Sequence, residues 1–375
     1  MTFPLIKFTD IVQDKSGGNK KLPQEFFLID GQYPVVDQSK KFIAGYINDQ
    51  EYLVKSTGLP VVIFGDHTKA IKYVDFPFAM GADGVKVLKP KDECDTKYLY
   101  HYLRYAKIPD AGYSRHFKFL KELEIPLPPL AEQRRIASIL DQADELRQKR
   151  QQAIEKLDQL LQATFIDMFG DPVSNPKGWD KLKIEDIASD AKYSIKAGPF
   201  GSALKKEDYV LHGYKIYGQE QVIRDDFEYG DYYITEEKYK SLENCSISSR
   251  DVLISLVGTF GKISVVPDQF EAGIINPRLM KITFDDSKIN PYFFKYLFSL
   301  DQMLDVVKSY SHGGTMGIVN VGIIKNIMII VPPLRLQEAF IEILDTVLVI
   351  KNQHRQAINS NLFEALQNQA FSGTL

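Results

Sequence analysis

The stretch Ile125–Gly170 reads IPLPPLAEQRRIASILDQADELRQKRQQAIEKLDQLLQATFIDMFG, and the chain contains a second version of it. From Ile329 the C-terminal part reads IIVPPLRLQEAFIEILDTVLVIKNQHRQAINSNLFEALQNQAFSG. The motif Pro-Pro-Leu at 128–130 recurs at 332–334, an offset of 204 residues. The offset holds without a shift over about thirty positions, which indicates an internal repeat rather than a coincidence of composition.

Each copy predicts one long helix. The proline pair at 128–129 suits the start of a helix but not its interior, so it marks the boundary. Apolar residues follow at three- and four-residue spacing between 136 and 168. Gly170, with Pro172 behind it, is typical of a helix C-terminus. About 38 residues at the helical rise give a rod of roughly 57 Å. The second copy, at about 335–371, is the expected partner for its apolar stripe.

A polar interruption lies near the middle of each predicted helix. It reads RQKRQQ at 147–152 and KNQHRQ at 351–356, again 204 residues apart. Parallel and antiparallel pairing would both align the two interruptions, so they do not set the direction of pairing. One interpretation is a solvated stretch that tolerates polarity. The other is a device that fixes the register, or a docking patch for a partner.

The helices separate two non-helical regions that resemble each other. In the first, short strand-like runs such as LPVVIF at 59–64 alternate with Gly, Pro and Asp. A helix is expected at Thr96–Tyr105 and an exposed loop at 109–118. The second region begins with WDKLKIEDIA at 179–188, which matches FPLIKFTDIV at 3–12. The ends and strands match, whereas the interiors differ in length.

The sequence therefore predicts an α+β chain built as a tandem duplication. The expected segments are a β-rich domain at 1–127, a helix at 128–172, a second β-rich domain at 173–329 and a second helix at 330–375. Such a pseudo-twofold molecule suits a ligand with two parts, and duplex DNA is the natural one. Two half-sites one helical turn apart are about 34 Å apart, a distance that a rod of roughly 57 Å spans.

Composition narrows the class of protein. At 375 residues, with 44% hydrophobic and 25% charged residues, the chain is expected to be globular with two or three domains. The net charge of −3 argues mildly against nucleic acid as a ligand. The two cysteines, Cys94 and Cys245, fit no metal-ligand spacing and favour a reducing compartment. Without a signal peptide or a long apolar span, a cytoplasmic protein with no membrane contact is expected.

The sequence lacks the motifs of a catalyst. It contains no GxxxxGK[ST] loop, no GxGxxG loop, no HExxH and no GxSxG. The segment NPYF at 290–293 is similar to a loop of adenine methyltransferases, but it lacks the second proline and any upstream glycine-rich cofactor loop. The simpler interpretation is that Asn-Pro begins a helix. The six histidines show no ligand spacing, so no metal site is expected.

Two copies of a Pro-Pro-Leu start, a long helix and a Phe-Gly end, separating two β-rich domains, resemble the specificity subunit of type I restriction-modification systems. In the second domain AGPFGSALKKEDY at 197–209, HGYKIYGQEQV at 212–222 and LISLVGTFGKI at 253–263 are similar to segments of that family's target recognition domains. In the first domain GQYPVVDQS, at 31–39, stands where the second has GYKIYGQEQ. Nothing there corresponds clearly to the GPFGS loop.

The resemblance implies a function in DNA recognition without catalysis by this chain. Each recognition domain would read one half of a bipartite site in double-stranded DNA. The two helices would form an antiparallel coiled coil that fixes the spacer and docks two modification (adenine methyltransferase) subunits. Two restriction subunits with translocase and nuclease activity would complete the enzyme. S-adenosylmethionine, ATP and Mg would bind these partners, and this chain would hold no cofactor.

Candidate DNA contacts are long hydrogen-bonding side chains on loops, because Arg or Lys reads guanine, Asn or Gln reads adenine, and Lys or Ser binds phosphate. If 217–221 is a strand, its alternating polar residues share one face. The candidates in the second domain are Ser202, Lys205, Lys206, Tyr217, Gln219, Gln221, Lys262, Asn276, Arg278, His312 and Thr315. Those in the first domain are Gln38, Ser39, Lys40, Lys41, His67, Thr68, Lys69, Lys72, Arg115 and His116. For each, a solvated turn or an ordinary exposed side chain is the alternative.

Two other functions compete with DNA recognition. A scaffold, in which a coiled-coil spacer holds two protein-binding domains, agrees with the acidic balance. Binding to random-sequence duplexes in the presence of a modification subunit would discriminate it. An autonomous methyltransferase conflicts with the missing cofactor loop, and S-adenosylmethionine binding by the isolated chain would test it.

Overall fold

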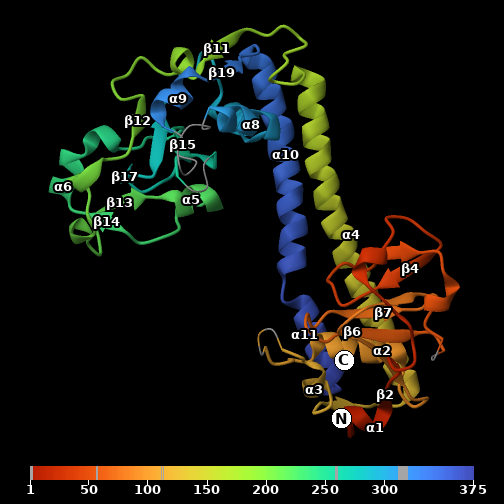
Figure 1. Cartoon of the computed structure of the whole chain (residues 1–375). Helices are drawn as coiled ribbons and strands as arrows, with labels where there is room; N and C mark the ends of the chain where they lie inside the picture. Colours follow the sequence, from red (N-terminus) through yellow and green to blue (C-terminus); the bar gives the residue numbers. More distant parts are fainter. Residues whose placement is uncertain (1–2, 56–57, 111, 113, 258–260, 311–319) are drawn as a thin grey trace. The chain divides into compact units, whose positions relative to one another are not determined.

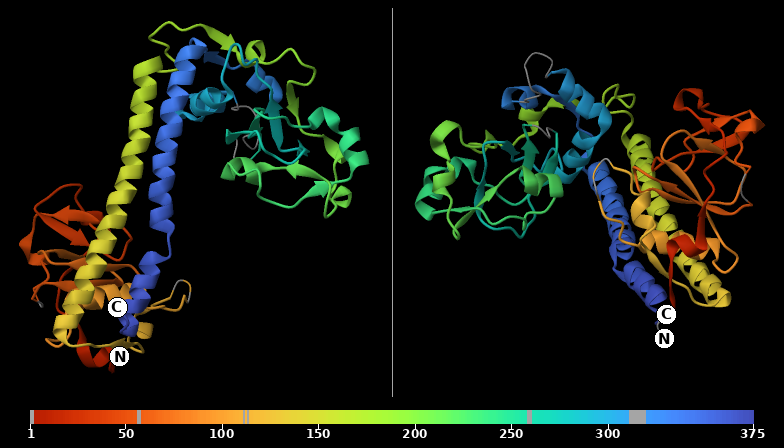
Figure 2. Two further views of the ribbon diagram at one scale, coloured as in Figure 1. Left: turned by 180° about the vertical axis from the view of Figure 1, so that it is seen from behind. Right: turned by 60° about the horizontal axis from the view of Figure 1, so that its bottom comes forward.

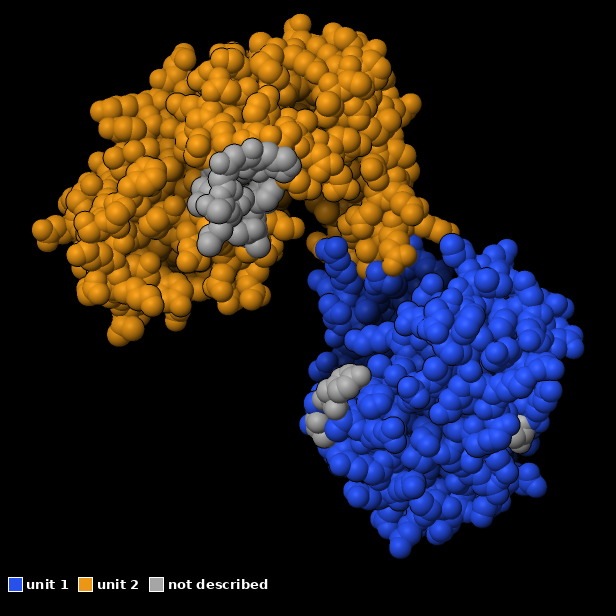
Figure 3. Space-filling view, in the orientation of Figure 1, with its two compact units in different colours: residues 1–152, 354–375 blue, residues 153–353 orange. Residues whose placement is uncertain are grey.

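The computed structural model describes residues 3–55, 58–110, 112, 114–257, 261–310 and 320–375. The chain divides into two compact units, coloured separately in Figure 3. Unit 1 consists of residues 1–152 and 354–375, and unit 2 of residues 153–353. In the part of the chain that is described, no helix is both long and apolar enough to cross a membrane.

The first long helix, α4, extends over Leu130–Phe169 without a break. The second begins as α10 at Leu334–Asn359 and continues as α11 at Leu362–Ser372. The expected helix starts after the proline pairs are confirmed, but the prediction of a continuous second helix is wrong. Asn and Ser side chains favour hydrogen bonds to nearby backbone groups over a helix interior, and such residues occupy 359–361, where the Ser360 hydroxyl donates to the Ala357 carbonyl at 3.0 Å. The first copy has Glu, Lys and Leu at the same repeat positions.

Within each unit the long helices pair antiparallel, as Figures 1 and 2 show for α4 and α10 in unit 2. There, Phe165 packs edge-on against Phe340 with ring centroids 5.4 Å apart, and Asp158 forms an ion pair with Lys351. In unit 1 the Arg147 guanidinium lies 4.7 Å from the centre of the Phe363 ring. Residue numbers rise along one helix as they fall along the other, so the expected antiparallel coiled coil is confirmed.

Unit 1 carries three sheets. Their orders are β1-β10, β2-β9-β6-β7 and β3-β8-β4-β5. The strands are β1 Leu5–Lys7, β2 Val12–Asp14, β3 Lys21–Leu22, β4 Tyr33–Val36, β5 Gly45–Ile47, β6 Val61–Gly65, β7 Ile71–Val74, β8 Ala79–Gly81, β9 Val85–Pro90 and β10 Glu124–Pro126. The shorter helices are α1 Phe8–Ile11, α2 Thr96–Tyr105 and α3 Phe117–Leu120. The predicted helix at Thr96–Tyr105 is confirmed, and Asp95 caps its N-terminus.

Unit 2 repeats this arrangement with the orders β11-β19, β12-β18-β15-β16 and β14-β13-β17. The strands are β11 Lys181–Lys183, β12 Ile195–Ala197, β13 Tyr214–Tyr217, β14 Tyr233–Ile234, β15 Val252–Ser255, β16 Ile263–Val265, β17 Gly273–Ile275, β18 Leu279–Ile282 and β19 Met328–Ile330. The shorter helices are α5 Gln219–Arg224, α6 Glu236–Ser241, α7 Pro291–Ser299, α8 Asp301–Ser309 and α9 Val321–Asn326. Strand β13 pairs antiparallel with β14 and parallel with β17, as β4 does with β5 and β8.

A buried glutamine attaches each long helix to the shorter helix beside it. In unit 1 the Gln133 Oε1 accepts a hydrogen bond from the Asp95 backbone N–H at 2.7 Å. Its Nε2 donates to the carbonyls of Glu93 and Pro128, at 3.0 and 2.8 Å. Gln133 is completely buried, and the three hydrogen bonds to the backbone satisfy both polar atoms of its amide.

Unit 2 contains the same arrangement at the same repeat position. The Gln337 Oε1 accepts from the Asn290 backbone N–H at 2.8 Å. Its Nε2 donates to the carbonyls of Lys288 and Pro332, at 3.1 and 2.7 Å. We refer to Gln133 and Gln337 with these partners as the glutamine clasps. They explain the recurrence of glutamine after each Pro-Pro-Leu motif.

Candidate nucleic-acid interface

A pocket in unit 2 gathers several of the predicted contact residues. Its volume is about 710 Å³, and it lies between the segment before Tyr209, helix α5 and the turn between β17 and β18. Six candidates line it, namely Lys205, Lys206, Gln219, Gln221, Asn276 and Arg278. Three of these are cationic and the others are amides, a mixture that suits both phosphates and base edges.

Two glycines allow the backbone segments to meet around Asn276. A Cβ at Gly198 would lie 1.9 Å from the Asn276 carbonyl oxygen, and one at Gly218 would lie 2.8 Å from Asn276 Nδ2. A side chain at Gly198 would therefore require a shift of the backbone, and one at Gly218 would displace the Asn276 side chain. The Asn276 Oδ1 accepts a hydrogen bond from the Arg278 backbone N–H at 2.9 Å. This local bond shapes the turn that presents Arg278.

Gln219 and Arg278 meet inside this pocket. The Gln219 Nε2 donates to Ser255 Oγ at 2.7 Å and also to the Val257 carbonyl. Its Oε1 accepts from Arg278 Nη1 at 3.4 Å. Gln219 is partly exposed and Arg278 is exposed. The pair therefore connects the start of α5, the end of β15 and the turn before β18.

The prediction that Tyr217, Gln219 and Gln221 share one face of a strand is wrong. Strand β13 ends at Tyr217, and α5 begins at Gln219. The Gln221 Oε1 accepts from the Gly218 backbone N–H at 2.9 Å, which stabilises the first turn of a helix. The Tyr217 ring is fully buried, and its hydroxyl donates to the Glu271 carbonyl at 2.6 Å. Burial raises the pKa of Tyr217, so the hydroxyl stays protonated.

Two further described candidates of unit 2, Ser202 and Lys262, do not line the pocket. Ser202 lies exposed in a short 3₁₀ turn at Gly201–Ala203. Lys262 is exposed and follows Gly261, whose φ of 80° favours glycine. His312 and Thr315 lie outside the described residues.

Three residues that the sequence reasoning missed also line the pocket. Tyr209 and Tyr232 have ring centroids 5.7 Å apart, and Glu220 adds one negative charge. Tyr209 closes the segment AGPFGSALKKEDY, so its place in that motif was a usable signal. Tyr232 comes to the pocket because Val210 bridges to Tyr233, a pairing between distant segments that the sequence does not display.

In unit 1 the candidates at 38–41 form the loop after β4. The Ser39 hydroxyl donates to Asp37 Oδ1 at 2.6 Å, and Lys40 and Lys41 are exposed. Lys72, predicted to contact DNA, is only 5% exposed. Its Nζ donates to the carbonyls of Asp37 and Lys41, at 2.8 and 2.6 Å. Lys72 therefore stabilises the loop from within, so the prediction of an exposed contact is wrong for it.

Gln38 links this loop to the turn between β6 and β7. Its Oε1 accepts from the His67 backbone N–H at 3.2 Å, and its carbonyl accepts from the Thr68 hydroxyl. Lys69 adopts a positive φ of 58° and pairs with Asp110 at 3.1 Å. These four residues thus come together in one loop cluster.

The expected exposed loop at 109–118 is only partly exposed. Arg115 is exposed, but the His116 ring is 1% exposed. Its Nδ1 lies 3.0 Å from the Asp66 carbonyl, to which the His116 backbone N–H also donates at 2.8 Å. His116 is therefore a buried structural residue, and the expectation that it lies exposed in this loop is wrong.

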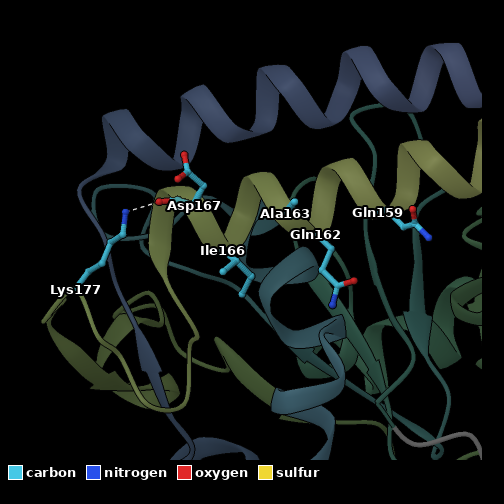
Figure 4. A pocket seen from close by; sticks show the side chains of 6 residues that line it. All are labelled: Gln159, Gln162, Ala163, Ile166, Asp167 and Lys177. Carbon is cyan, nitrogen blue, oxygen red and sulfur yellow. Dashed lines mark hydrogen bonds between the residues drawn. The ribbon is translucent and has the colours of Figure 1, made fainter.

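A second hollow lies along α4 in unit 2 and has a different character. It holds about 660 Å³ and is lined by Gln159, Gln162, Ala163, Ile166, Asp167 and Lys177 (Figure 4). Lys177 Nζ donates to the Asp167 carbonyl, so the one cation there is already engaged. Neither this hollow nor any other part of the described chain groups three or more histidine, cysteine or carboxylate side chains that could hold a metal ion.

Comparison with known proteins agrees with the repeated architecture. Residues 6–156 and 176–360 match the model of the family described as type I restriction modification DNA specificity domain. The EcoR124I/EcoR124II specificity subunit of Escherichia coli is 32% identical over 120 residues, which cover 29% of this chain and 30% of that protein. The MjaVIII specificity subunit of Methanocaldococcus jannaschii is 25% identical over 64% of this chain and 60% of its own length. The chain thus spans less than two thirds of these relatives.

Two solved structures share the fold over nearly the whole chain. The S subunit of a type I restriction-modification system from M. genitalium has a TM-score of 0.62 at 15% identity, covering 99% of this chain and 96% of that one. A chain from a study of complex assembly and conformational transition of the type I R-M system has a TM-score of 0.58 at 17% identity, covering 100% and 98%. These structures share the fold, and the match to the family model over residues 6–156 and 176–360 shows that the chain belongs to the type I restriction-modification specificity subunit family.

Proposed function

We propose that this chain gives a type I restriction-modification enzyme its DNA sequence specificity, with each β-rich domain reading one half of a bipartite duplex site. The pocket of unit 2 carries the proposal. It brings together six side chains that the sequence selected for phosphate or base contacts, and they come from three separated segments. In unit 1 the loops around Lys40, Lys41, Thr68 and Arg115 supply the corresponding surface.

The division of labour between the two β-rich domains follows from the duplication. The domains at 1–127 and 173–329 act as target recognition domains, because they share strand order but differ in the residues they expose. The helical pair sets the number of unspecified base pairs between the halves. It also docks two modification subunits, and two restriction subunits join to complete the enzyme.

The chemistry of the enzyme belongs to the partners in this proposal. The modification subunits bind S-adenosylmethionine and methylate adenine, while the restriction subunits use ATP and Mg. This chain holds no cofactor and positions the target sequence. Its exposed cations bind phosphates, so affinity falls steeply as salt rises.

Mapping methylated adenines in DNA from cells that express this chain with its modification partner tests the proposal. The expected result is one asymmetric motif of two specified parts separated by a fixed number of unspecified base pairs. Methylation of all adenines alike contradicts it. An unmodified genome, combined with equal binding of the purified complex to all duplexes, favours a scaffold instead.

A further inference from the structure

Gln219 has no hydrogen-bond donor left for DNA. A glutamine amide nitrogen carries two N–H donors, and those of Gln219 go to Ser255 Oγ and the Val257 carbonyl. Its oxygen accepts from Arg278 Nη1. The orientation of the amide is determined by these partners, because a carbonyl only accepts and a guanidinium only donates.

Reading adenine requires one donor and one acceptor from the same amide, directed at N7 and N6. In Gln219 one donor is bound to the buried Ser255 at the end of β15, and the other to the carbonyl of Val257, two residues further along the chain. A direct contact with adenine would therefore cost at least one of these internal hydrogen bonds. The geometry suits Gln219 to hold a neighbour in place.

Arg278 is that neighbour, and its guanidinium is available to contact DNA. It forms no ion pair with any described residue, and its side chain is exposed at the pocket. Its backbone is held by the bond from its N–H to Asn276 Oδ1 and by the fixed φ of Pro277 before it. Of five guanidinium donors, one points to Gln219. The rest form a planar fork that matches the N7 and O6 acceptors of guanine.

Unit 1 repeats the glutamine but not the arginine. Gln38 follows β4 as Gln219 follows β13, and its Oε1 accepts from the His67 backbone N–H in the loop after β6. The Gln38 amide is tightly enclosed, because a Cβ at Gly84 would lie 2.4 Å from its Oε1. In both units, then, a glutamine at the end of the corresponding strand stabilises the loop after β6 or β15. This recurrence supports a positioning role for Gln219.

From this geometry we infer that Arg278 is a specificity-determining residue that reads a guanine in the half-site of unit 2, and that Gln219 is its positioning residue. The inference rests on the proposed function. It assigns a G·C pair to one position of one half-site, and it separates two residues that the sequence alone places in the same class.

The test uses the full chain in complex with its modification partner. Competition binding measures the relative affinity for duplexes that carry the methylated motif, with one base pair replaced at a time. The wild-type complex is expected to prefer G·C at one position by on the order of 10- to 100-fold. Arg278→Ala reduces this preference to within about 3-fold and leaves the preferences at all other positions unchanged.

The Gln219→Ala variant tests whether Gln219 positions Arg278 or contacts a base itself. It lowers the preference at the same position by a smaller factor, and the double variant with Arg278→Ala shows no further loss. Lys206→Ala is the matched control, an exposed cation lining the same pocket. It weakens binding to all duplexes alike and reduces the slope of log affinity against log salt by about 1.

Three results would overturn the inference. One is full retention of every base preference by Arg278→Ala, and another is a change at an A·T position. The third is a Gln219→Ala effect at a position different from that of Arg278→Ala. If Arg278→Ala abolishes binding altogether, Arg278→Gln decides, because an amide matches the donor and acceptor of adenine and not the two acceptors of guanine. An unchanged preference for G·C in this variant would contradict the assignment. A wild-type complex without any bipartite motif contradicts the proposed function itself, so the two failures are distinguishable.

Discussion

The two units share one frame but differ where the short helix meets the long one. In unit 1 the contact is ionic: Lys97 and His101 on α2 bind Asp141 on α4 at 2.5 and 2.8 Å. Arg104 pairs with Asp144 one turn further along. In unit 2 the corresponding contact, between α7 and α10, is aromatic. The Phe340 ring of α10 lies 4.8 and 6.5 Å, between centroids, from Tyr296 and Phe293 of α7. Phe165 of α4 joins this cluster at 5.4–6.0 Å from the same three rings.

The glutamine clasps are the same in both units, whereas the packing of the short helix against the long helix differs. The comparison indicates which contacts the two copies retained as they diverged. A clasp satisfies backbone groups that are buried at the start of each long helix, so no other side chain replaces it easily. The interface between the short and long helices next to the clasp accepts either ion pairs or aromatic side chains, provided that they are complementary. The surfaces that contact DNA in our proposal have diverged further still.

One pair of repeat positions illustrates this divergence. Arg147 and Lys351 are 204 residues apart and both lie in the polar interruptions. Arg147 covers the Phe363 ring in unit 1, while Lys351 pairs with Asp158 in unit 2 and is only 6% exposed. Each thus contacts the opposing helix, which favours a role in register over a purely solvated stretch.

The largest expected effect breaks the aromatic contact of unit 2. Phe165→Ala removes a fully buried ring with four aromatic neighbours and should lower the free energy of unfolding by about 3–5 kcal/mol. Urea denaturation of the full chain measures it, with hydrogen exchange locating the loss in unit 2. Leu160→Ala, 52% exposed on the same helix, is the control and should change little. Equal effects of the two variants would contradict the packing described.

Removing a clasp should affect the two units alike. Gln133→Leu and Gln337→Leu each leave buried backbone groups without a partner, which should cost roughly 1–3 kcal/mol. Denaturation of each variant measures the loss, and Gln159→Leu on an exposed face of α4 controls for the change of residue type. A loss in only one unit would show that the clasps are not equivalent.

Acid should weaken unit 1 before unit 2. Burial lowers the pKa of His101, and the bond to Asp141 offsets only part of this. Below its ordinary pKa of about 6.5, the unfolded chain takes up a proton that folded His101 does not bind, so stability falls as the pH falls. Burial opposes ionisation of Asp141, but bonds from Lys97 and His101 outweigh it and lower its pKa. Its contribution is lost at more acidic pH, below about 4.

Hydrogen exchange of α2 and α7 across pH 7 to 5 measures this difference. We expect faster exchange in α2 at pH 5, with α7 nearly unchanged because its contact with α4 is aromatic. His101→Gln should remove the extra sensitivity of α2 in this range. An equal response of the two helices, or an unchanged response in His101→Gln, would contradict the assignment to His101.

The smallest effect concerns the ion pair between the long helices. Lys351→Met keeps the length of the side chain and should change the free energy of unfolding by less than about 1 kcal/mol. Asp158→Asn should cost more, because it leaves the buried Lys351 charge without its partner. Denaturation of both variants compares them, and the reverse order would exclude the register role.

Much of the frame could be predicted because its signals are local. The proline pairs, the apolar spacing and the constant offset located α4 and the start of α10, and the helix expected at Thr96–Tyr105 is α2. The break at Ser360 was missed because repeat matching implied a continuous helix, although the residues themselves disfavour one. For the site, the exposed polar loops selected Lys205, Asn276 and Arg278 one by one, and the structure places all three around one pocket.

The burial of Lys72 and His116 could not be predicted in the same way. Their partners, Asp37 and Asp66, lie 35 and 50 residues away along the chain. Only the tertiary fold brings these groups together, and a loop sequence does not show which of its polar residues face inward. The same limit applied to Tyr217, whose hydroxyl finds the distant Glu271 carbonyl.

Binding of the full chain with its modification partner to bipartite duplexes tests the central claim most directly. One set of duplexes has the first half of the methylated motif scrambled, a second set has the other half scrambled, and a third has base pairs added to the spacer. We predict a loss of affinity of at least about 100-fold in each set, with Arg278→Ala altering the response to one half only. Undiminished binding to any of the three sets would contradict two units that read two halves at a fixed separation.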